Sequence, residues 1–383
     1  MLKKGVVMRK ILILTGRYLP GFRDGGPVRS IVNLTQWFGD EYDIRIMCLD
    51  RDHGDLTAYP DITPEGYNAV GKAKVWYTRS FLPEDIARLA GDADVVYCCG
   101  PYGNYARQAM HLKKKGLFLA PLYIASMGSF SPEAFKIKGL KKRLFISYMK
   151  MAHLFDDITW SVTSAREEEE LKAIVGPDCR CVIATDLPRR GTTEHTYVKE
   201  AGALKLAFIS RISRKKNLSA VPDILHRMSD DVKVKLDIYG PGEDMDYLHA
   251  CMHKLDELKK SHPGCKWEYK GEADSEKIPE IFAGYDAFIF PTLGENYGHV
   301  IAESLSAGCI PVISDTTPWL ELDDKNCGYV CRLGDNSAFA RSLEELVAMS
   351  EEELTVKRDN CYKYINEVNE SSVRDSGYRA IFG

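Results

Sequence analysis

The sequence predicts an α/β protein made of two doubly wound, Rossmann-like domains that face each other across a cleft. Short apolar runs alternate with amphipathic segments in both halves of the chain, as expected for mostly parallel sheets that are covered by helices. The 383 residues are too many for one ordinary hydrophobic core. A polar stretch from Arg189 to Ala203, rich in charged residues, Thr and Gly, interrupts the alternation. Two domains joined by a linker follow from these observations.

The predicted boundaries place the first domain at residues 1–190, the linker at 191–203 and the second domain at 204–370. Residues 371–383 are predicted to form a weak C-terminal helix. This helix can cross back to the first domain. The chain has no internal sequence repeat that would indicate a solenoid or propeller.

In the first half, strands are expected at the short apolar runs and helices at the segments with helical periodicity between them. The expected strands are Lys10–Thr15, Asp43–Leu49, Lys74–Thr78, Asp94–Cys99, Leu122–Ser126, Thr159–Thr163 and Cys181–Thr185. The expected helices are Pro27–Phe38, Pro83–Ala90, Asn104–Lys115, Leu140–Phe155 and Ala165–Val175.

The second half repeats the same alternation. The expected strands are Leu204–Ile209, Val232–Tyr239, Lys266–Tyr269, Ala287–Phe290, Ile310–Ile313 and Gly328–Cys331. The expected helices are Leu218–Met228, Glu243–Lys260, Ile278–Tyr285, Gly298–Ala307, Ser337–Met349 and Glu351–Val368. Because ligands of open α/β sheets bind at the carboxyl ends of the strands, functional residues are expected in the loops that follow them.

Composition narrows the functional class. The chain is 45% hydrophobic and 28% charged, which is typical of a globular protein. A net charge of −4 argues against a dedicated nucleic-acid binder. The odd number of cysteines, 11, and the absence of a signal-peptide pattern favour free thiols in a reducing cytoplasm. No apolar run approaches the 18 or more residues of a membrane span.

The segment Ala287–Ser314 reads as strand, loop, helix and strand. Its first strand ends at Pro291, and the polar loop that follows contains Glu295. The helix begins near Gly298 and carries Glu303 one to two turns further on. The loop and the helix start therefore bring two carboxylates and several backbone N–H groups to one place. This combination suits the hydroxyls and anions of a sugar diphosphate.

Within this segment, Tyr297, Gly298 and His299 place backbone N–H groups at the positive end of the helix dipole. Glu303 is positioned to accept hydrogen bonds from both hydroxyls of a ribose, and Glu295 to contact the hydroxyls of a donor sugar. The alternatives are that Glu295 only complements the helix dipole and that Glu303 is a solvent-facing helix residue.

Three further loops follow predicted strands. Gly25 and Gly26 allow close approach of a ligand to the backbone just before a helix start. Arg211 directly follows a buried strand, where a guanidinium can hold a diphosphate, and Lys216 lies near the next helix start. Gly240 lies in a tight turn after the next strand. The alternatives are a flexible turn for the two glycines, a solvated basic loop for the cations and a structural turn for Gly240.

A basic stretch, Lys136–Arg143, precedes an apolar-rich helix. The apolar residues of this helix are Leu144, Phe145, Ile146, Tyr148, Met149 and Met151. Basic and apolar residues together suggest docking on an anionic membrane, where a lipid-linked acceptor would be found. The alternative is a cationic rim on a core helix.

The segment FPTLGENYGHVIAESLSAGCIPVIS closely resembles the glutamate–seven residues–glutamate signature of glycosyltransferase family 4. These are retaining enzymes with the GT-B architecture. The resemblance extends to Gly25-Gly26, to FISRISRKKN around Arg211 and Lys216, to IYGPGED around Gly240, and to YKGEADSEKIPEIFAGYDAFIFPT. It covers most of the second half and touches the first half mainly at its start.

The resemblance implies a role for each matching residue. Arg211 and Lys216 would hold the donor diphosphate, and Glu303 the nucleotide ribose. Glu295, the catalytic candidate, and the backbone amides of 297–299 would address the transferred sugar. Two departures are visible: Ser210 replaces the usual Gly before Arg211, and Met127–Ser129 stand in a loop where many members keep a histidine.

The expected reaction transfers a sugar from a UDP-sugar or GDP-sugar to an acceptor hydroxyl with retained configuration. The expected acceptor is a glycan or lipid-linked molecule, as in surface polysaccharide synthesis, and the expected location is the cytoplasm or the inner face of its membrane. No cofactor and no metal are expected, because cations of the chain replace the metal at the diphosphate. A sugar-nucleotide epimerase and a non-catalytic sugar-binding protein are the alternatives. A nicotinamide dehydrogenase is weaker, since no Gly-x-Gly-x-x-Gly follows the first strand.

Overall fold

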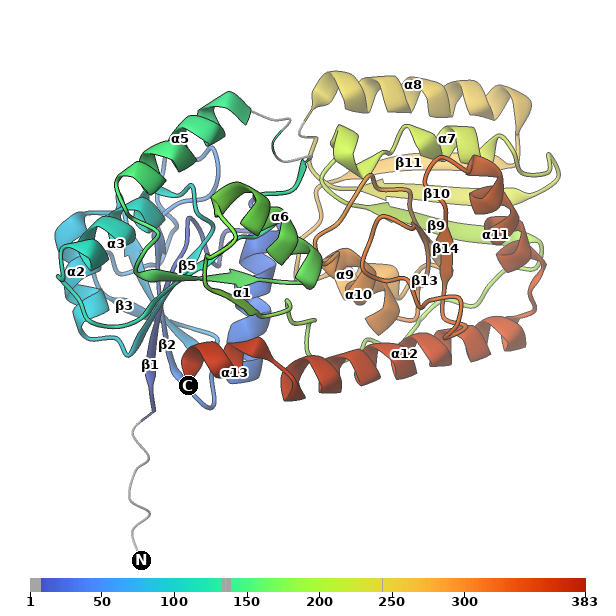
Figure 1. The fold of residues 1–383 in the computed structure, drawn as a ribbon. Helices are drawn as coiled ribbons and strands as arrows, with labels where there is room; N and C mark the ends of the chain where they lie inside the picture. Colours follow the sequence, from blue (N-terminus) through green and yellow to red (C-terminus); the bar gives the residue numbers. More distant parts are fainter. Residues whose placement is uncertain (1–7, 133–134, 136–138, 243) are drawn as a thin grey trace, which may run out of the picture. The chain divides into compact units, whose positions relative to one another are not determined.

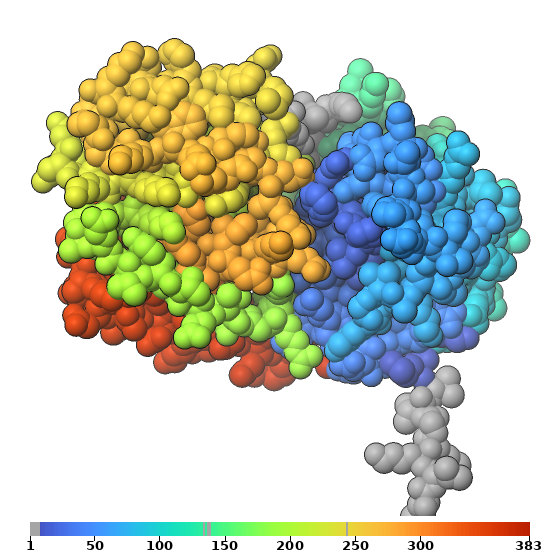
Figure 2. All heavy atoms as spheres, turned by 180° about the vertical axis from the view of Figure 1, so that it is seen from behind, coloured from blue at the N-terminus to red at the C-terminus, as the bar shows by residue number. Residues whose placement is uncertain are grey.

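The computed structural model describes residues 8–132, 135, 139–242 and 244–383. The chain divides into two compact units, one formed by residues up to 187 together with 371–383 and the other by residues 188–370 (Figure 1). The division after Leu187 lies a few residues before the predicted boundary at 190. Residues 188–202 belong to the second unit and run over its surface (Figure 2).

The first unit contains an eight-stranded sheet with the order β3-β4-β2-β1-β5-β6-β7-β8. Its strands are β1 (Lys10–Leu14), β2 (Asp43–Leu49), β3 (Tyr67–Val70), β4 (Ala73–Thr78), β5 (Val95–Cys99), β6 (Leu122–Ala125), β7 (Ile158–Val162) and β8 (Cys181–Ile183). Its helices are α1 (Gly26–Phe38), α2 (Pro83–Gly91), α3 (Asn104–Lys114), α5 (Gly139–Met151), α6 (Ala165–Val175) and α13 (Gly377–Phe382). The paired strands run parallel except at the β3–β4 edge, which is antiparallel.

Alternate residues of the central strands of this sheet belong to different hydrophobic cores, as the pleat of a strand requires. Leu12 and Leu14 of β1 pack in the core that includes residues of α2, α3, α5 and α6. Ile11 and Ile13 pack in the core that includes residues of α1 and α13. Both faces of the sheet are therefore covered, which explains why β1 is apolar at consecutive positions.

The second unit contains a parallel six-stranded sheet with the order β11-β10-β9-β12-β13-β14. Its strands are β9 (Ala203–Ile209), β10 (Lys233–Tyr239), β11 (Cys265–Gly271), β12 (Ala287–Phe290), β13 (Ile310–Ser314) and β14 (Tyr329–Cys331). The short helix η1 (Arg214–Lys216) precedes α7 (Ala220–Leu225), α8 (Met245–Ser261), α9 (Ile278–Phe282), α10 (His299–Ser306), α11 (Asn336–Ala348) and α12 (Glu351–Arg374).

Several predicted elements need correction. The edge strand β3 was not predicted, because Tyr67–Val70 is short and half exposed and so has no clear buried face. Helix α5 ends at Met151 rather than at Phe155, and His153 just beyond it adopts a left-handed φ of 50°. Helix α12 continues past Val368 to Arg374, since no Gly or Pro interrupts it there.

The observed bounds of two further helices also differ from the predicted ones. Helix α7 covers Ala220–Leu225 rather than Leu218–Met228, because turns flank it on both sides. Helix α9 ends at Phe282, two residues before Gly284, rather than at Tyr285. Glu243, the predicted start of α8, lies outside the described residues.

The C-terminal helix α13 completes a core of the first unit, beside α1 (Figure 1). Phe382 is fully buried and its ring meets Phe38 edge to face, with centroids 6.2 Å apart. Tyr42 contacts the same ring at 5.3 Å. The weak periodicity of residues 371–383 hides this role, because a helix of six residues makes only one or two turns.

In the described part of the chain, each helix is too short or too polar to cross a bilayer.

Phe382→Ala is expected to lower the free energy of unfolding of the first unit by about 3–5 kcal/mol, because it removes a fully buried aromatic ring. Urea unfolding measures the change. The matched control is Leu56→Ala in the same unit, where the side chain is 90% exposed and the expected change is below about 0.5 kcal/mol. Equal effects of the two substitutions would contradict the packing of α13.

Candidate functional site

The candidate site lies where the second sheet reverses its winding. From β9 the strands β10 and β11 continue to one side, whereas β12, β13 and β14 continue to the other. The loops after β9 and β12 therefore leave neighbouring strands at their carboxyl ends. This arrangement opens the crevice in which doubly wound sheets bind ligands.

The two loops are joined by hydrogen bonds. The backbone N–H of Leu293 donates to the carbonyl of Lys215 at 2.8 Å. The side-chain amide of Asn217 donates to the carbonyl of Pro291 at 2.9 Å, and the hydroxyl oxygen of Thr292 lies 3.2 Å from the carbonyl oxygen of Lys215. These bonds fix the position of η1 against the loop that carries Glu295.

Lys216 and Glu295 form an ion pair across the two loops. Lys216 Nζ lies 2.6 Å from Glu295 Oε1, and their side chains are only 16% and 11% exposed. The hydroxyl of Thr292 donates to the same carboxylate oxygen at 2.9 Å. Two residues predicted separately for the diphosphate and the sugar thus meet in one place.

Burial lowers the pKa of Lys216 below its usual value, because desolvation disfavours the ammonium. Glu295 opposes this effect, while the positive charges of Lys215 and Arg211 add to it. Arg211, which is exposed just after β9, is therefore within electrostatic reach of Lys216. An anion bound between them would relieve the repulsion between these cations.

The start of α10 is held in a left-handed turn. Gly298 is the N-cap residue with φ 84° and ψ 56°, a conformation that favours glycine. The indole N–H of Trp319 donates to the carbonyl of Tyr297 at 2.6 Å, and the ring of His299 lies 4.8 Å from that of Tyr297. The first backbone N–H groups of such a helix have no acceptor within the helix, which makes its start suited to an anion.

Glu303 lies on α10 and is only 6% exposed. The alternative interpretation, a solvent-facing helix residue, is therefore wrong. Its carboxylate is thus largely shielded from water, where hydrogen bonds to it are strong.

Gly240 is required by the fold itself. It adopts φ 132°, and a Cβ built at this position would lie 1.7 Å from the carbonyl oxygen of Ser210. The turn after β10 is thus pressed against the loop that begins with Arg211. This geometry is sufficient to explain Gly240 without a ligand.

Gly25 and Gly26 lie in the first unit, at the start of α1, and so belong to a different compact unit from the other candidates. Gly25 is the N-cap residue with φ 65°, whereas a Cβ at Gly26 would meet no atom within 4 Å. The preceding loop is held by Asp52, whose carboxylate accepts hydrogen bonds from the backbone N–H groups of Phe22 at 3.0 Å and His53 at 2.7 Å.

The sequence analysis did not identify two residues that shape loops of the first unit, Asp52 and Glu167. Asp52 could have been found, since it closely follows a correctly predicted strand. Glu167 could not have been identified from the sequence, because it is one of four consecutive glutamates in α6. Its buried carboxylate accepts hydrogen bonds from the backbone N–H groups of Gly128 and Thr163 and from the Thr163 hydroxyl. It thereby holds the loop after β6, in which Met127 and Gly128 have positive φ.

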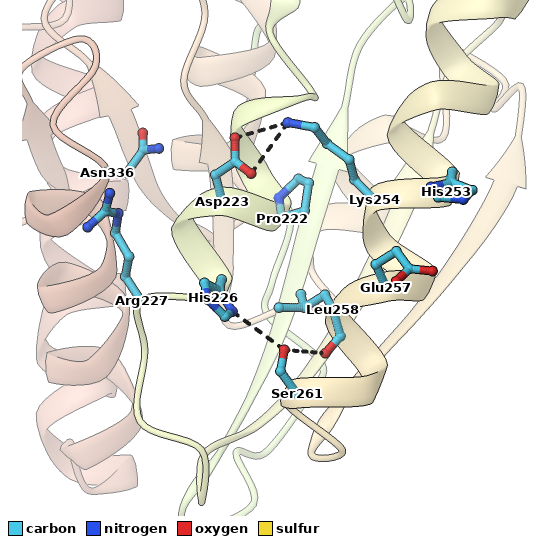
Figure 3. Close-up of a pocket in the computed structure, with 10 residues that line it drawn as sticks. All are labelled: Pro222, Asp223, His226, Arg227, His253, Lys254, Glu257, Leu258, Ser261 and Asn336. Atoms are coloured by element: carbon cyan, nitrogen blue, oxygen red, sulfur yellow. Dashed lines mark hydrogen bonds and ion pairs between the residues drawn. The ribbon is translucent and has the colours of Figure 1, made fainter.

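A separate hollow of about 580 Å³ lies between α7 and α8 in the second unit (Figure 3). Its wall includes the ion pair of Asp223 and Lys254, 3.1 Å apart, and a 3.5 Å hydrogen bond between Ser261 and His226. None of the predicted site residues lines this hollow.

All eleven cysteines are free thiols. Throughout the described ranges, no three metal-ligating side chains come together. The candidate site includes the cations Arg211, Lys215 and Lys216 and the carboxylates Glu295 and Glu303, together with the rings of Tyr297 and His299.

Lys216→Met and Glu295→Gln are each expected to lower the free energy of unfolding by about 1–3 kcal/mol, because each leaves a partly buried polar partner without its ion pair. The double variant should lose clearly less than the two single losses combined, by about 1–3 kcal/mol. Urea unfolding of the four proteins measures this coupling energy.

The control is the exposed pair of Arg214 and Asp244, 3.2 Å apart and 73% and 37% exposed. The corresponding cycle with Arg214→Met and Asp244→Asn should give a coupling below about 1 kcal/mol. Additive losses for Lys216 and Glu295 would show that their contact does not stabilise the loops.

Part of the chain is similar to a known protein family. Residues 203–349 match the family model described as glycosyl transferases group 1. A search of curated protein sequences finds no significant match.

Solved structures match almost the whole chain at low sequence identity. An α,α-trehalose-phosphate synthase (UDP-forming) from Burkholderia xenovorans, in complex with glucose-6-phosphate, has a TM-score of 0.70 and 11% identity, with 98% of this chain and 100% of that chain covered. Sucrose-phosphate synthase from Thermosynechococcus elongatus has a TM-score of 0.67 and 11% identity, covering 98% and 99%. Anabaena HepE, in complex with UDP and glucose, has a TM-score of 0.65 and 14% identity, covering 96% and 99%. The chain thus has a two-domain α/β fold like that of GT-B glycosyltransferases, and residues 203–349 of its second unit are similar to the glycosyl transferases group 1 model.

Proposed function

We propose that this protein is a retaining glycosyltransferase that moves a hexosyl group from a UDP-sugar to an acceptor hydroxyl. The observation that carries the proposal is the meeting of Lys216 and Glu295 at the reversal point of the second sheet. Both residues lie inside the segment that matches the glycosyl transferases group 1 model. UDP is favoured over GDP because the similar proteins include complexes with UDP or a UDP-sugar and a UDP-forming synthase.

The diphosphate is assigned to the cations of the loop after β9. Arg211 and Lys216 would bind its oxygens, with the first N–H groups of α10 as additional donors. As the bond between the anomeric carbon and the diphosphate breaks, negative charge accumulates on the leaving group. Cations that are already in place stabilise this charge without reorganisation. In this proposal they replace a divalent metal.

The two carboxylates have separate roles in the proposal. Glu303, buried on α10, would accept hydrogen bonds from the ribose hydroxyls. Glu295 would contact hydroxyls of the transferred sugar, and its bond to Thr292 sets its orientation before the donor arrives. Because Lys216 pairs with Glu295 in the structure, one ammonium group can link the sugar subsite to the diphosphate subsite.

We further propose a glycan or lipid-linked acceptor of the kind used in surface polysaccharide synthesis. Such an acceptor would place the enzyme in the cytoplasm, at the inner face of the membrane. Gly25 and Gly26, at the start of α1, are proposed as backbone contacts for the substrates.

Arg211→Ala is expected to raise the Kd for UDP at least about tenfold, since a charge-assisted hydrogen bond contributes about 1.5–3 kcal/mol and tenfold corresponds to about 1.4 kcal/mol. Isothermal titration calorimetry measures the change. The control is Arg214→Ala in the same loop, because Arg214 is 73% exposed and pairs with Asp244. An unchanged Kd for Arg211→Ala, or an equal rise in both variants, would contradict the assignment of the diphosphate.

Incubation with UDP-glucose and octyl glucoside is expected to yield UDP and a product with the α configuration of the donor, identified by NMR of the anomeric proton. Glu295→Gln should lower kcat by about 100-fold, the effect of losing one preorganised contact to the transition state. UDP affinity should change much less, because Glu295 is assigned to the sugar. A β-linked product would exclude retention, and conversion of UDP-glucose to another UDP-sugar without acceptor would indicate an epimerase.

A further inference from the structure

Helix α5 presents an apolar stripe on the exterior of the first unit. Leu140, Leu144, Tyr148 and Met151 are 74%, 63%, 45% and 77% exposed. Their spacing of four, four and three residues places all of them on one face of the helix. Figure 1 shows α5 at the rim of this unit, outside the sheet. Four large apolar side chains in one exposed row differ from the single surface hydrophobics that are common in globular proteins.

The opposite face of α5 anchors the helix to its own unit. Ile146 and Met149 are 4% and 0% exposed and belong to the core that also contains Trp160. Phe145 packs against the same core. Within the stripe, Tyr148 also contacts His111 of α3, with ring centroids 6.4 Å apart. Leu140, Leu144 and Met151 remain available to another surface.

Basic residues border the stripe on both sides. On a helical projection Lys141 falls on one side, and Arg143 and Lys150 fall on the other. The helix contains no Asp or Glu. An apolar row with cationic flanks is the pattern of a helix that lies in the plane of an anionic lipid surface, because long basic side chains can extend from the apolar layer to the headgroups.

Neighbouring segments extend this surface. Lys114 Nζ donates to the carbonyl of Ala152 at 2.6 Å, which joins the end of α3 to the end of α5. Beyond α3 the chain exposes Leu117 and Leu119, which are 55% and 89% exposed. From Val95 to Phe155 the sequence contains ten Lys and Arg residues but a single acid, Glu133, in a chain with a net charge of −4. Positive charge is thus concentrated in this part of the sequence.

We propose that the exposed stripe of α5, defined by Leu140, Leu144, Tyr148 and Met151, docks the protein on an anionic lipid bilayer. The apolar side chains enter the boundary between headgroups and acyl chains, while Lys141 and Arg143 contact the anionic headgroups. Lys150 instead donates to the carbonyl of Ile174 at 2.7 Å. An acidic protein partner would also match the charges, but an exposed apolar row with basic residues on both sides matches the acyl chains and anionic headgroups of a bilayer together. The placement of a lipid-linked acceptor at this surface rests on the proposed function. Binding of the protein to lipid can be measured without a donor or an acceptor.

The test is sedimentation of the full chain with vesicles of phosphatidylcholine alone and with about one third phosphatidylserine. Binding is expected only with phosphatidylserine, and it should weaken as the salt concentration rises from about 0.1 to about 1 M, since the screening length falls from about 10 to about 3 Å. Leu144→Asp, and Lys141→Glu with Arg143→Glu, should each lower the partition coefficient at least about tenfold.

Two controls match these changes. Leu56→Asp alters an equally exposed leucine of the same unit, which is 90% exposed, and Lys266→Glu reverses an exposed charge in the second unit. Both should bind vesicles like the wild type. Thermal unfolding and UDP titration of every variant show whether its fold is intact.

Three results would overturn the inference: no binding to phosphatidylserine vesicles, equal binding to both vesicle types, or equal losses in the α5 variants and the controls. A change in oligomeric state on Leu144→Asp, with vesicle binding intact, would instead identify the stripe as a protein interface. Failure of the proposed function is recognised separately, because Arg211→Ala should affect UDP binding and leave vesicle binding unchanged.

Discussion

The organisation of the second unit depends on the contact between the loops that follow β9 and β12. These strands are neighbours in the sheet, but the chain winds away from them in opposite directions. The ion pair of Lys216 and Glu295, at 2.6 Å, connects the two loops where the chain reverses its winding. Its members carry the charges that a sugar diphosphate requires, so one interaction both fixes the loops and prepares the site for a ligand. A ligand that binds these residues loses little free energy in ordering the loops, because the ion pair already holds them in place.

The sequence was a good guide to the fold where strands are buried on both faces. Ala287–Phe290 is predicted with its observed bounds, because a strand that is buried at every position is a continuous apolar run. Asp43–Leu49 is also predicted with its observed bounds, although the half-buried Asp43 and Arg45 interrupt its apolar residues. The exposed edge strand Tyr67–Val70 carries no such run and was missed. Helix ends were predicted less accurately. Helices α5 and α12 end at turns where no Pro follows the last helical residue.

For the candidate site, the sequence indicated which loops matter but not how their residues pair. The position of Lys216 after a strand suggested a phosphate contact, while its partner Glu295 lies 79 positions further along the chain. Such a pairing depends on strand order, which the alternation of elements does not determine. The burial of Glu303 and the role of Glu167 depend in the same way on packing between distant segments.

The position of α13 has a consequence for biosynthesis. The first unit uses residues from both ends of the chain, whereas the second unit is one continuous stretch, 188–370. On the ribosome, the aromatic cluster around Phe38 is completed only when Tyr378 and Phe382 have been translated. The second unit can close before that moment, because domains generally fold as units during synthesis. The core of the first unit thus depends on residues that are translated after the whole of the second unit.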